Sequence, residues 1–167
     1  QKRTIEDHFT TDQNFLKNFK KNDRFRNDLE KFYSMLNMSK IFWINQQKPK
    51  GFGDAVLYSE SFVGSDDFLV SAGDTLILNN DKIIKKMIDV ELKEKNDALL
   101  VLKKVTNPKR FGVAVIKETQ NKIQITNVEE KPVKPKSNLS IVALYRFKPS
   151  IFKALREIKH GNKELQL

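Results

Sequence analysis

The stretch from Lys48 to Asp74 reads KPKGFGDAVLYSESFVGSDDFLVSAGD and contains a glycine turn, an amphipathic helix, an apolar run and an aspartate. Gly51 and Gly53 let backbone approach a flat ligand closely, because no Cβ atom stands in the way. The run over 68–72 is typical of a buried parallel strand. Asp74 follows it, at the strand end where open α/β sheets bind ligands, so it is a candidate metal ligand. An aspartate after a glycine is more often part of a turn or a helix cap.

Helix and strand patterns alternate on either side of this stretch. We expect helices over 4–9, 23–38 and 81–95, and a closing helix over 149–158. Strands are predicted over 41–45, 98–105, 112–116, 122–128 and 139–147. The βαβ rhythm from 68 to 105 indicates an α/β fold with a Rossmann-like mixed, mostly parallel sheet and flanking helices.

Composition limits the class of protein. The 167 residues are 39% hydrophobic and 10% aromatic, which is typical of a globular chain with a real core. The absence of cysteine excludes disulfides and thiolate sites and favours a reducing compartment, so we expect a cytoplasmic protein. No apolar run approaches the roughly 20 residues that cross a bilayer, and we expect no membrane contact.

The formal net charge of +10 is compatible with nucleic acid, an anionic surface or small phosphorylated substrates. Most lysines and arginines alternate with acids, as on solvated helix faces. The exception is LKNFKKNDRFR, over 16–26, whose neighbouring Phe15, Phe19 and Phe25 either stack on bases or anchor short helices in a core. A basic nucleic-acid-binding domain therefore stays an alternative, although it leaves the acidic motifs unexplained.

A second group of candidate residues follows the predicted strand over 122–128. Glu130 can accept hydrogen bonds from sugar hydroxyls while the adjacent Lys131 offers a point charge to a phosphate. Gly112 lets a sugar ring lie against backbone. Each also has an ordinary reading, as a solvated turn or as a glycine at the start of a strand.

Several segments in order resemble the bacterial and archaeal sugar-1-phosphate nucleotidylyltransferases, most closely the glucose-1-phosphate uridylyltransferase branch. They are KRTIEDHF, Gln46 with GFGDAV, the strand ending in Gly73-Asp74, PKRFGV, EEKPVKPKSNLSIVALYRF and GNKELQL. Together they cover nearly the whole chain, and the joined EEKP, PKSNL and ALY segments are the most specific. The insertion after KRTIEDHF favours the uridylyl branch over the thymidylyl branch.

The resemblance implies an enzyme that forms UDP-glucose and pyrophosphate from UTP and glucose 1-phosphate. It implies that Gln46 reads the uracil edge, that Gly51 gives the base room and that Asp74 binds Mg²⁺. Gly112, Glu130, Lys131 and Ile141 are implied to hold glucose 1-phosphate, with Asp74 and Lys131 the catalytic residues. A homo-oligomer, dimer or tetramer, is expected, with no nucleic acid as partner.

Two family features are absent from the sequence. The glycine-rich G-x-G-T-R loop that holds the triphosphate would precede residue 1, and the second metal aspartate would follow residue 167. We therefore expect residues 1–167 to be a single catalytic domain that is incomplete at both ends. Alternatives are a thymidylyltransferase and a non-catalytic relative that binds sugar nucleotide.

Overall fold

The computed structural model describes residues 3–21, 23–78, 80–90, 92, 96–120, 122–158, 165 and 167. The chain divides into two compact units, residues 1–47 and residues 48–167. No helix in the described ranges is long and apolar enough to span a membrane. The expectation of one incomplete catalytic domain stays a prediction.

The first unit consists of three helices, α1 (Arg3–His8), α2 (Gln13–Leu16) and α3 (Arg24–Asn37). Aspartates begin the second and third, because a carboxylate at the N-cap accepts hydrogen bonds from the helix's unpaired first amides. The Asp12 carboxylate accepts from Asn14 N at 2.8 Å, and that of Asp23 accepts from Phe25 N at 2.8 Å. The helices predicted over 4–9 and 23–38 are confirmed.

Aromatic contacts hold this unit together. The ring of Phe19 lies 5.2 Å from that of Phe15 and 5.0 Å from that of Phe25. Phe15 and Phe25 are 43% and 55% exposed, so these rings contact one another without forming a buried core, and stacking on bases stays an alternative. The strand predicted over 41–45 is wrong, because these residues form no strand. A strand requires a backbone partner, and no strand is found in the described part of residues 1–47.

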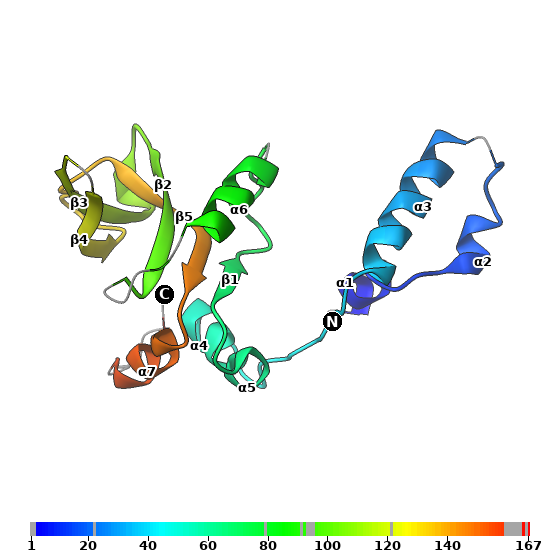
Figure 1. Ribbon diagram of the computed structural model, residues 1–167, viewed down its shortest axis with the longest axis horizontal. Helices are drawn as coiled ribbons and strands as arrows, with labels where there is room; N and C mark the ends of the chain where they lie inside the picture. The colour runs from blue at the N-terminus through cyan, green and yellow to red at the C-terminus, as the bar shows by residue number, and fades with distance from the viewer. Residues whose placement is uncertain are drawn as a thin grey trace. The chain divides into compact units, whose positions relative to one another are not determined.

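The second unit is built on a five-stranded sheet with the order β1-β5-β3-β4 and with β2 also paired to β5. The strands are β1 (Phe68–Ser71), β2 (Ala98–Lys104), β3 (Gly112–Thr119), β4 (Lys122–Glu130) and β5 (Leu139–Phe147). Helix α6 (Asn80–Asp89) connects β1 to β2, and the short 3₁₀ turn η1 (Pro108–Arg110) precedes β3 (Figure 1). Helix α6 ends before the predicted limit of 95; residues 91 and 93–95 lie outside the described ranges.

The α/β class is confirmed, but the expected pairing directions are not. All four strand pairings of the described residues are antiparallel. The βαβ rhythm is still present, since β1 and β2 run in the same direction. Strand β5 lies between them and is antiparallel to both, with Tyr145 facing Val70 on one side and Leu100 on the other. Among the described residues β1 thus has an antiparallel neighbour, in contrast to the mostly parallel sheet expected from the sequence.

A small hydrophobic core joins β1 to three helices, α4 (Phe52–Leu57), α5 (Glu60–Val63) and α7 (Ser150–Glu157). Figure 1 shows these helices grouped beside the start of β1 and the end of β5. Val56, Phe152 and Leu155 are at most 5% exposed, and Leu165 packs with them. The expected closing helix over 149–158 is confirmed as α7.

Candidate active site

A pocket of about 880 Å³ lies where β1, β2 and β4 end and where β3 and β5 begin. Antiparallel pairing brings these ends together, because Ser140 of β5 is opposite Lys103 of β2 on one side and Val113 of β3 on the other. The pocket is lined by five residues that the sequence predicted, Asp74, Gly112, Glu130, Lys131 and Ile141. Residues that are far apart in the chain thus share one cavity, and their individual roles stay predictions.

One wall of the pocket is formed by Gly112, Glu130 and Ile141. Gly112, the first residue of β3, is paired with Glu130, the last residue of β4. A Cβ atom on Gly112 would lie 3.0 Å from Oε2 of Glu130 and 3.7 Å from Cδ1 of Ile141. The absence of a side chain at position 112 therefore leaves room for the Glu130 carboxylate against the strand.

Lys131 adopts a strained backbone conformation next to this wall. Its φ of 42° lies in the left-handed region, where a side chain costs about 1–2 kcal/mol. The Lys131 amide donates to the carbonyl of Phe111 at 3.1 Å, which holds the residue at the end of the β3–β4 ladder. Its ammonium lies 3.5 Å from Oε1 of Glu130, and both side chains are at least half exposed. Such an ion pair contributes little stability, so this charge remains available to a ligand.

The loop after Lys131 is held by Ser137. Its hydroxyl donates to the carbonyl of Ala114 at 2.5 Å and accepts a hydrogen bond from the Leu139 amide at 3.1 Å. The Val105 amide donates to the carbonyl of Asn138 at 2.9 Å. The EEKPVKPKSNL segment is thereby fixed at both ends, and it places Lys131 and β5 on adjacent sides of the pocket.

Asp74 lies in a turn directly beyond β1. The Ala72 amide donates to Ala143 of β5 at 2.9 Å, and the Thr75 amide donates back to Ala72 at 3.2 Å. This turn carries the Asp74 side chain, which is exposed, to the pocket. The two readings of Asp74, turn residue and strand-end ligand, are therefore compatible. No group of three or more histidines, aspartates or glutamates suited to a metal occurs in the described ranges.

Two further cationic residues line the pocket, Lys103 of β2 and Arg110 of η1. With Lys131 they outnumber the two carboxylates, Asp74 and Glu130, which suits an anionic ligand. The sequence did not single them out, because a lysine at the end of a strand and an arginine in a short turn have the pattern of solvent-exposed residues. Arg110 is part of the quoted PKRFGV segment, which was the available signal.

Tyr145 is a buried residue of β5, two positions beyond Ala143 of the pocket lining. Its ring stacks on Phe147 at 5.3 Å and lies 6.3 Å from that of Phe52. Burial raises the pKa of the Tyr145 phenol above its ordinary value of 10.0, and the negative charge of Glu130 raises it further. The Glu130 carboxylate therefore acts electrostatically on the core side of the sheet as well as on the pocket.

Two predicted site residues are not part of the pocket lining. Gly51 has a φ of 108°, and a Cβ atom there would lie 2.8 Å from the Leu165 nitrogen. The Leu165 amide donates to Lys50 at 2.8 Å, and its carbonyl accepts from Gly53 at 3.0 Å. Close approach by this backbone thus requires a glycine at position 51, independently of any base. Gln46 belongs to residues 1–47, and its role in base reading stays a prediction.

Comparison with known proteins identifies the family. A family model described as nucleotidyl transferase matches residues 9–166. The chain belongs to the nucleotidyl transferase family. The nucleotidyl transferase identity inferred from the ordered segments is confirmed, together with the α/β fold class.

Curated relatives resemble this chain over most of its length. A UTP–glucose-1-phosphate uridylyltransferase of Mycoplasma genitalium is 37% identical over 140 residues, which cover 78% of this chain and 47% of the relative. A glucose-1-phosphate thymidylyltransferase of Streptomyces griseus is 35% identical over 119 residues, which cover 71% of this chain and 32% of the relative. The chain thus spans about half or less of the length of these two relatives.

Solved structures give the same relationship. A UDP-glucose pyrophosphorylase complexed with UDP-glucose is similar to this chain with a TM-score of 0.81 and 25% identity. The similarity covers 99% of this chain and 62% of the solved one. Both units of the chain therefore have counterparts in a single known protein.

Proposed function

We propose that this nucleotidyl transferase forms UDP-glucose and pyrophosphate from UTP and glucose 1-phosphate. The observation that carries the proposal is the shared pocket of Asp74, Gly112, Glu130 and Lys131. An oxygen of glucose 1-phosphate attacks the α-phosphorus of UTP and forms the new P–O bond. The bond from the α-phosphorus to the bridging oxygen breaks, and pyrophosphate leaves. No covalent enzyme intermediate is required.

The residues of the chain would bind and align two polyanions that repel each other. Glu130 accepts hydrogen bonds from sugar hydroxyls, and Gly112 lets the ring lie close to the strand. The Lys131 ammonium neutralises the sugar phosphate, and Lys103 and Arg110 add positive charge to the same cavity. Ile141 provides an apolar contact beside Gly112. Gln46 and Gly51 belong to the proposal as base-binding residues.

Magnesium is the proposed cofactor, with Asp74 as its protein ligand. Mg²⁺ is usually held by one or two carboxylates together with substrate phosphates, and the exposed Asp74 carboxylate on this pocket fits that donor set. When bound, the ion would neutralise charge on the transferred phosphoryl group. The cytoplasmic location and the homo-oligomeric state expected from the sequence are parts of the same proposal.

A second candidate is nucleotidyl transfer from dTTP, in place of UTP, to glucose 1-phosphate. The similarity to the Streptomyces griseus thymidylyltransferase favours it, and a single base methyl changes binding only modestly. A non-catalytic relative would instead bind UDP-glucose without turnover.

The test is pyrophosphate release by the full-length protein from UTP plus glucose 1-phosphate, with and without Mg²⁺ and with dTTP as the comparison. Release that requires both substrates and metal, with UTP preferred, is the expected result. Preference for dTTP would select the thymidylyl reaction. Binding of UDP-glucose with no release would select the non-catalytic relative.

A further inference from the structure

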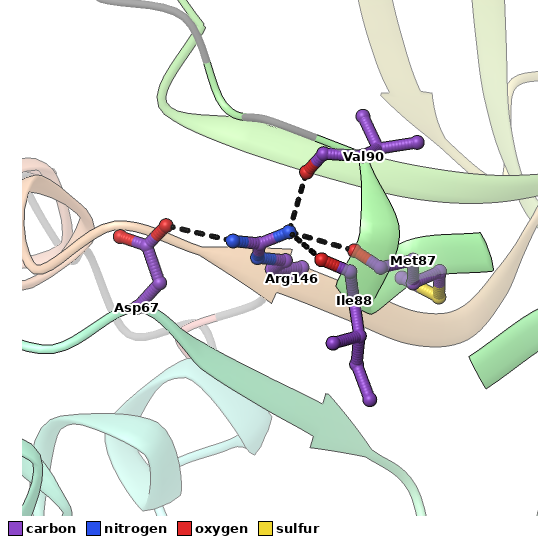
Figure 2. Close-up of polar contacts among 5 residues, drawn as sticks. All are labelled: Asp67, Met87, Ile88, Val90 and Arg146. Carbon is purple, nitrogen blue, oxygen red and sulfur yellow. Dashed lines mark hydrogen bonds and ion pairs between the residues drawn. The ribbon is translucent and has the colours of Figure 1, made fainter. Parts of the chain in front are cut away.

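Arg146 joins two distant segments of the chain. Its side chain is 17% exposed and extends from β5, and one terminal nitrogen lies 3.1 Å from Oδ2 of Asp67. The other terminal nitrogen donates to the carbonyls of Met87 at 2.8 Å, Ile88 at 2.9 Å and Val90 at 2.5 Å. Figure 2 shows the guanidinium between the Asp67 carboxylate and these three carbonyls.

These contacts have a clear physical basis. The last carbonyls of a helix lack partners within the helix and carry partial negative charge, so a cation at the end of α6 is favourable. Arginine's planar, multi-donor fork suits this position better than a lysine point charge does. Asp67 balances the charge, and its partial burial reduces screening by solvent.

The groups that Arg146 contacts lie on either side of a part of the pocket lining in the sequence. Asp67 directly precedes β1, whereas Met87 and Ile88 lie in the last turn of α6 and Val90 directly follows it. Arg146 therefore contacts both ends of the segment 67–90. Asp74 and residues 75–78 lie within the segment 67–90 and line the pocket, as does Ile83 of α6. Leu76 and Leu78 are 91% and 86% exposed, so apolar burial does little to fix this loop.

We infer that Arg146 is a positioning residue for the loop that contains Asp74 and residues 75–78. It acts by fixing both ends of the segment that carries the loop, and it does not itself line the pocket. The inference rests on the proposed role of Asp74 for its effect on activity. Its effect on α6 is independent of that role.

The test compares Arg146→Met with Arg156→Met in the full-length protein. Arg156 of α7 forms a similar ion pair with Glu60, which lies outside the segment 67–90. The side chains of this pair are more exposed than those of Arg146 and Asp67. We expect Arg146→Met to raise the Mg²⁺ concentration for half-maximal pyrophosphate release roughly ten- to hundredfold, the cost typical of losing a residue that supports a metal ligand. Arg156→Met should leave that concentration unchanged. Arg146→Lys should give an intermediate value because it keeps the charge but loses the fork.

Hydrogen exchange of residues 80–90 provides a readout that needs neither metal nor turnover. Exchange should accelerate in Arg146→Met and stay unchanged in Arg156→Met. Equal exchange in both variants would overturn the inference, as would an unchanged Mg²⁺ requirement in an active Arg146→Met enzyme. Should Arg146→Met fail to fold, Asp67→Asn takes its place, with smaller changes expected in the same direction. If the unmodified protein releases no pyrophosphate, the proposed function fails while the exchange comparison still decides the inference.

Discussion

Gly112 and Glu130 are direct partners across β3 and β4, and the missing side chain of one makes room for the carboxylate of the other. A Cβ atom on Gly112 would approach Oε2 of Glu130 to 3.0 Å, which is closer than ordinary van der Waals contact. A side chain at position 112 would therefore displace the Glu130 carboxylate, which is the proposed ligand of the sugar hydroxyls.

Gly112→Ala should therefore weaken sugar-phosphate binding without unfolding the sheet. The Glu130 side chain is about half exposed, so it can move aside, and the expected result is a roughly tenfold higher KM for glucose 1-phosphate. Alanine in a strand stabilises by about 0.5 kcal/mol relative to glycine, so thermal stability should not fall. Gly73→Ala is the control, since its Cβ atom would meet nothing within 4 Å. A similar KM increase in both variants would contradict the prediction.

Asp74→Asn should abolish most metal-dependent turnover and leave stability nearly unchanged, because the side chain is exposed. We expect kcat to fall about a hundredfold, which corresponds to ~2.7 kcal/mol. Steady-state kinetics over a range of Mg²⁺ concentrations measures the effect. Asp66→Asn, an exposed aspartate outside the pocket lining, is the matched control. Full activity in Asp74→Asn would remove this residue from the site.

Lys131→Gly separates the charge of this residue from its strained backbone. Relief of the left-handed φ, about 1–2 kcal/mol, should roughly offset the 0.5–1 kcal/mol by which glycine's greater chain freedom destabilises the fold. Stability should then change little, whereas kcat/KM for glucose 1-phosphate should fall by about tenfold or more. Lys131→Ala should lose kcat/KM to the same extent but be less stable than Lys131→Gly, because alanine keeps the left-handed strain. Lys134→Ala, which changes an exposed lysine outside the pocket lining, should match the unmodified protein in both measurements.

The Tyr145 phenol should lose its proton at a higher pH than an ordinary tyrosine, and its ionisation should destabilise the fold at alkaline pH. Burial and then the Glu130 charge raise its pKa above 10.0, so the neutral phenol is favoured in the folded state. The resulting stability is fully present below the unfolded pKa of about 10 and is lost as pH rises through the higher folded pKa. Absorbance titration of the unmodified protein and of Tyr145→Phe isolates this component. Glu130→Gln should lower its midpoint only partly, because burial is the larger cause. The assignment would be refuted if the titration component that Tyr145→Phe removes has its midpoint at or below pH 10.

Gly51→Ala should destabilise the second unit more than Gly64→Ala does. Both glycines have positive φ values, 108° and 63°, so both variants incur left-handed strain. Only at Gly51 would the new Cβ atom collide with backbone, that of Leu165; at Gly64 it would meet nothing within 4 Å. Denaturant unfolding should show an additional loss of about 1–3 kcal/mol for Gly51→Ala. Equal losses would rule out the close approach of Leu165. UTP affinity in the same variants shows whether base binding changes beyond the stability effect.

The elements themselves were largely predictable from local pattern. Strand β5 was expected over 139–147 and is found at those bounds, and α3 and α7 agree closely with their predicted ranges. The failures involve pairing. The apolar residues over 41–45 suit a strand but form none, and the sheet expected to be mostly parallel has antiparallel pairings among the described residues. Periodicity reports which residues suit a strand; the partner and its direction depend on long-range contacts.

The sequence by itself determined the α/β class, the family resemblance and five residues of the pocket, because turn chemistry and ordered motifs are written in neighbouring positions. Only the tertiary structure decided that Lys103 and Arg110 line that pocket. It also decided that the Leu165 backbone requires a glycine at position 51. The same holds for the contacts of Arg146 with both ends of the segment 67–90. Each of these relationships joins residues distant in the chain. They arise when packing and backbone hydrogen bonding bring strand ends and helix ends together, which no local pattern specifies.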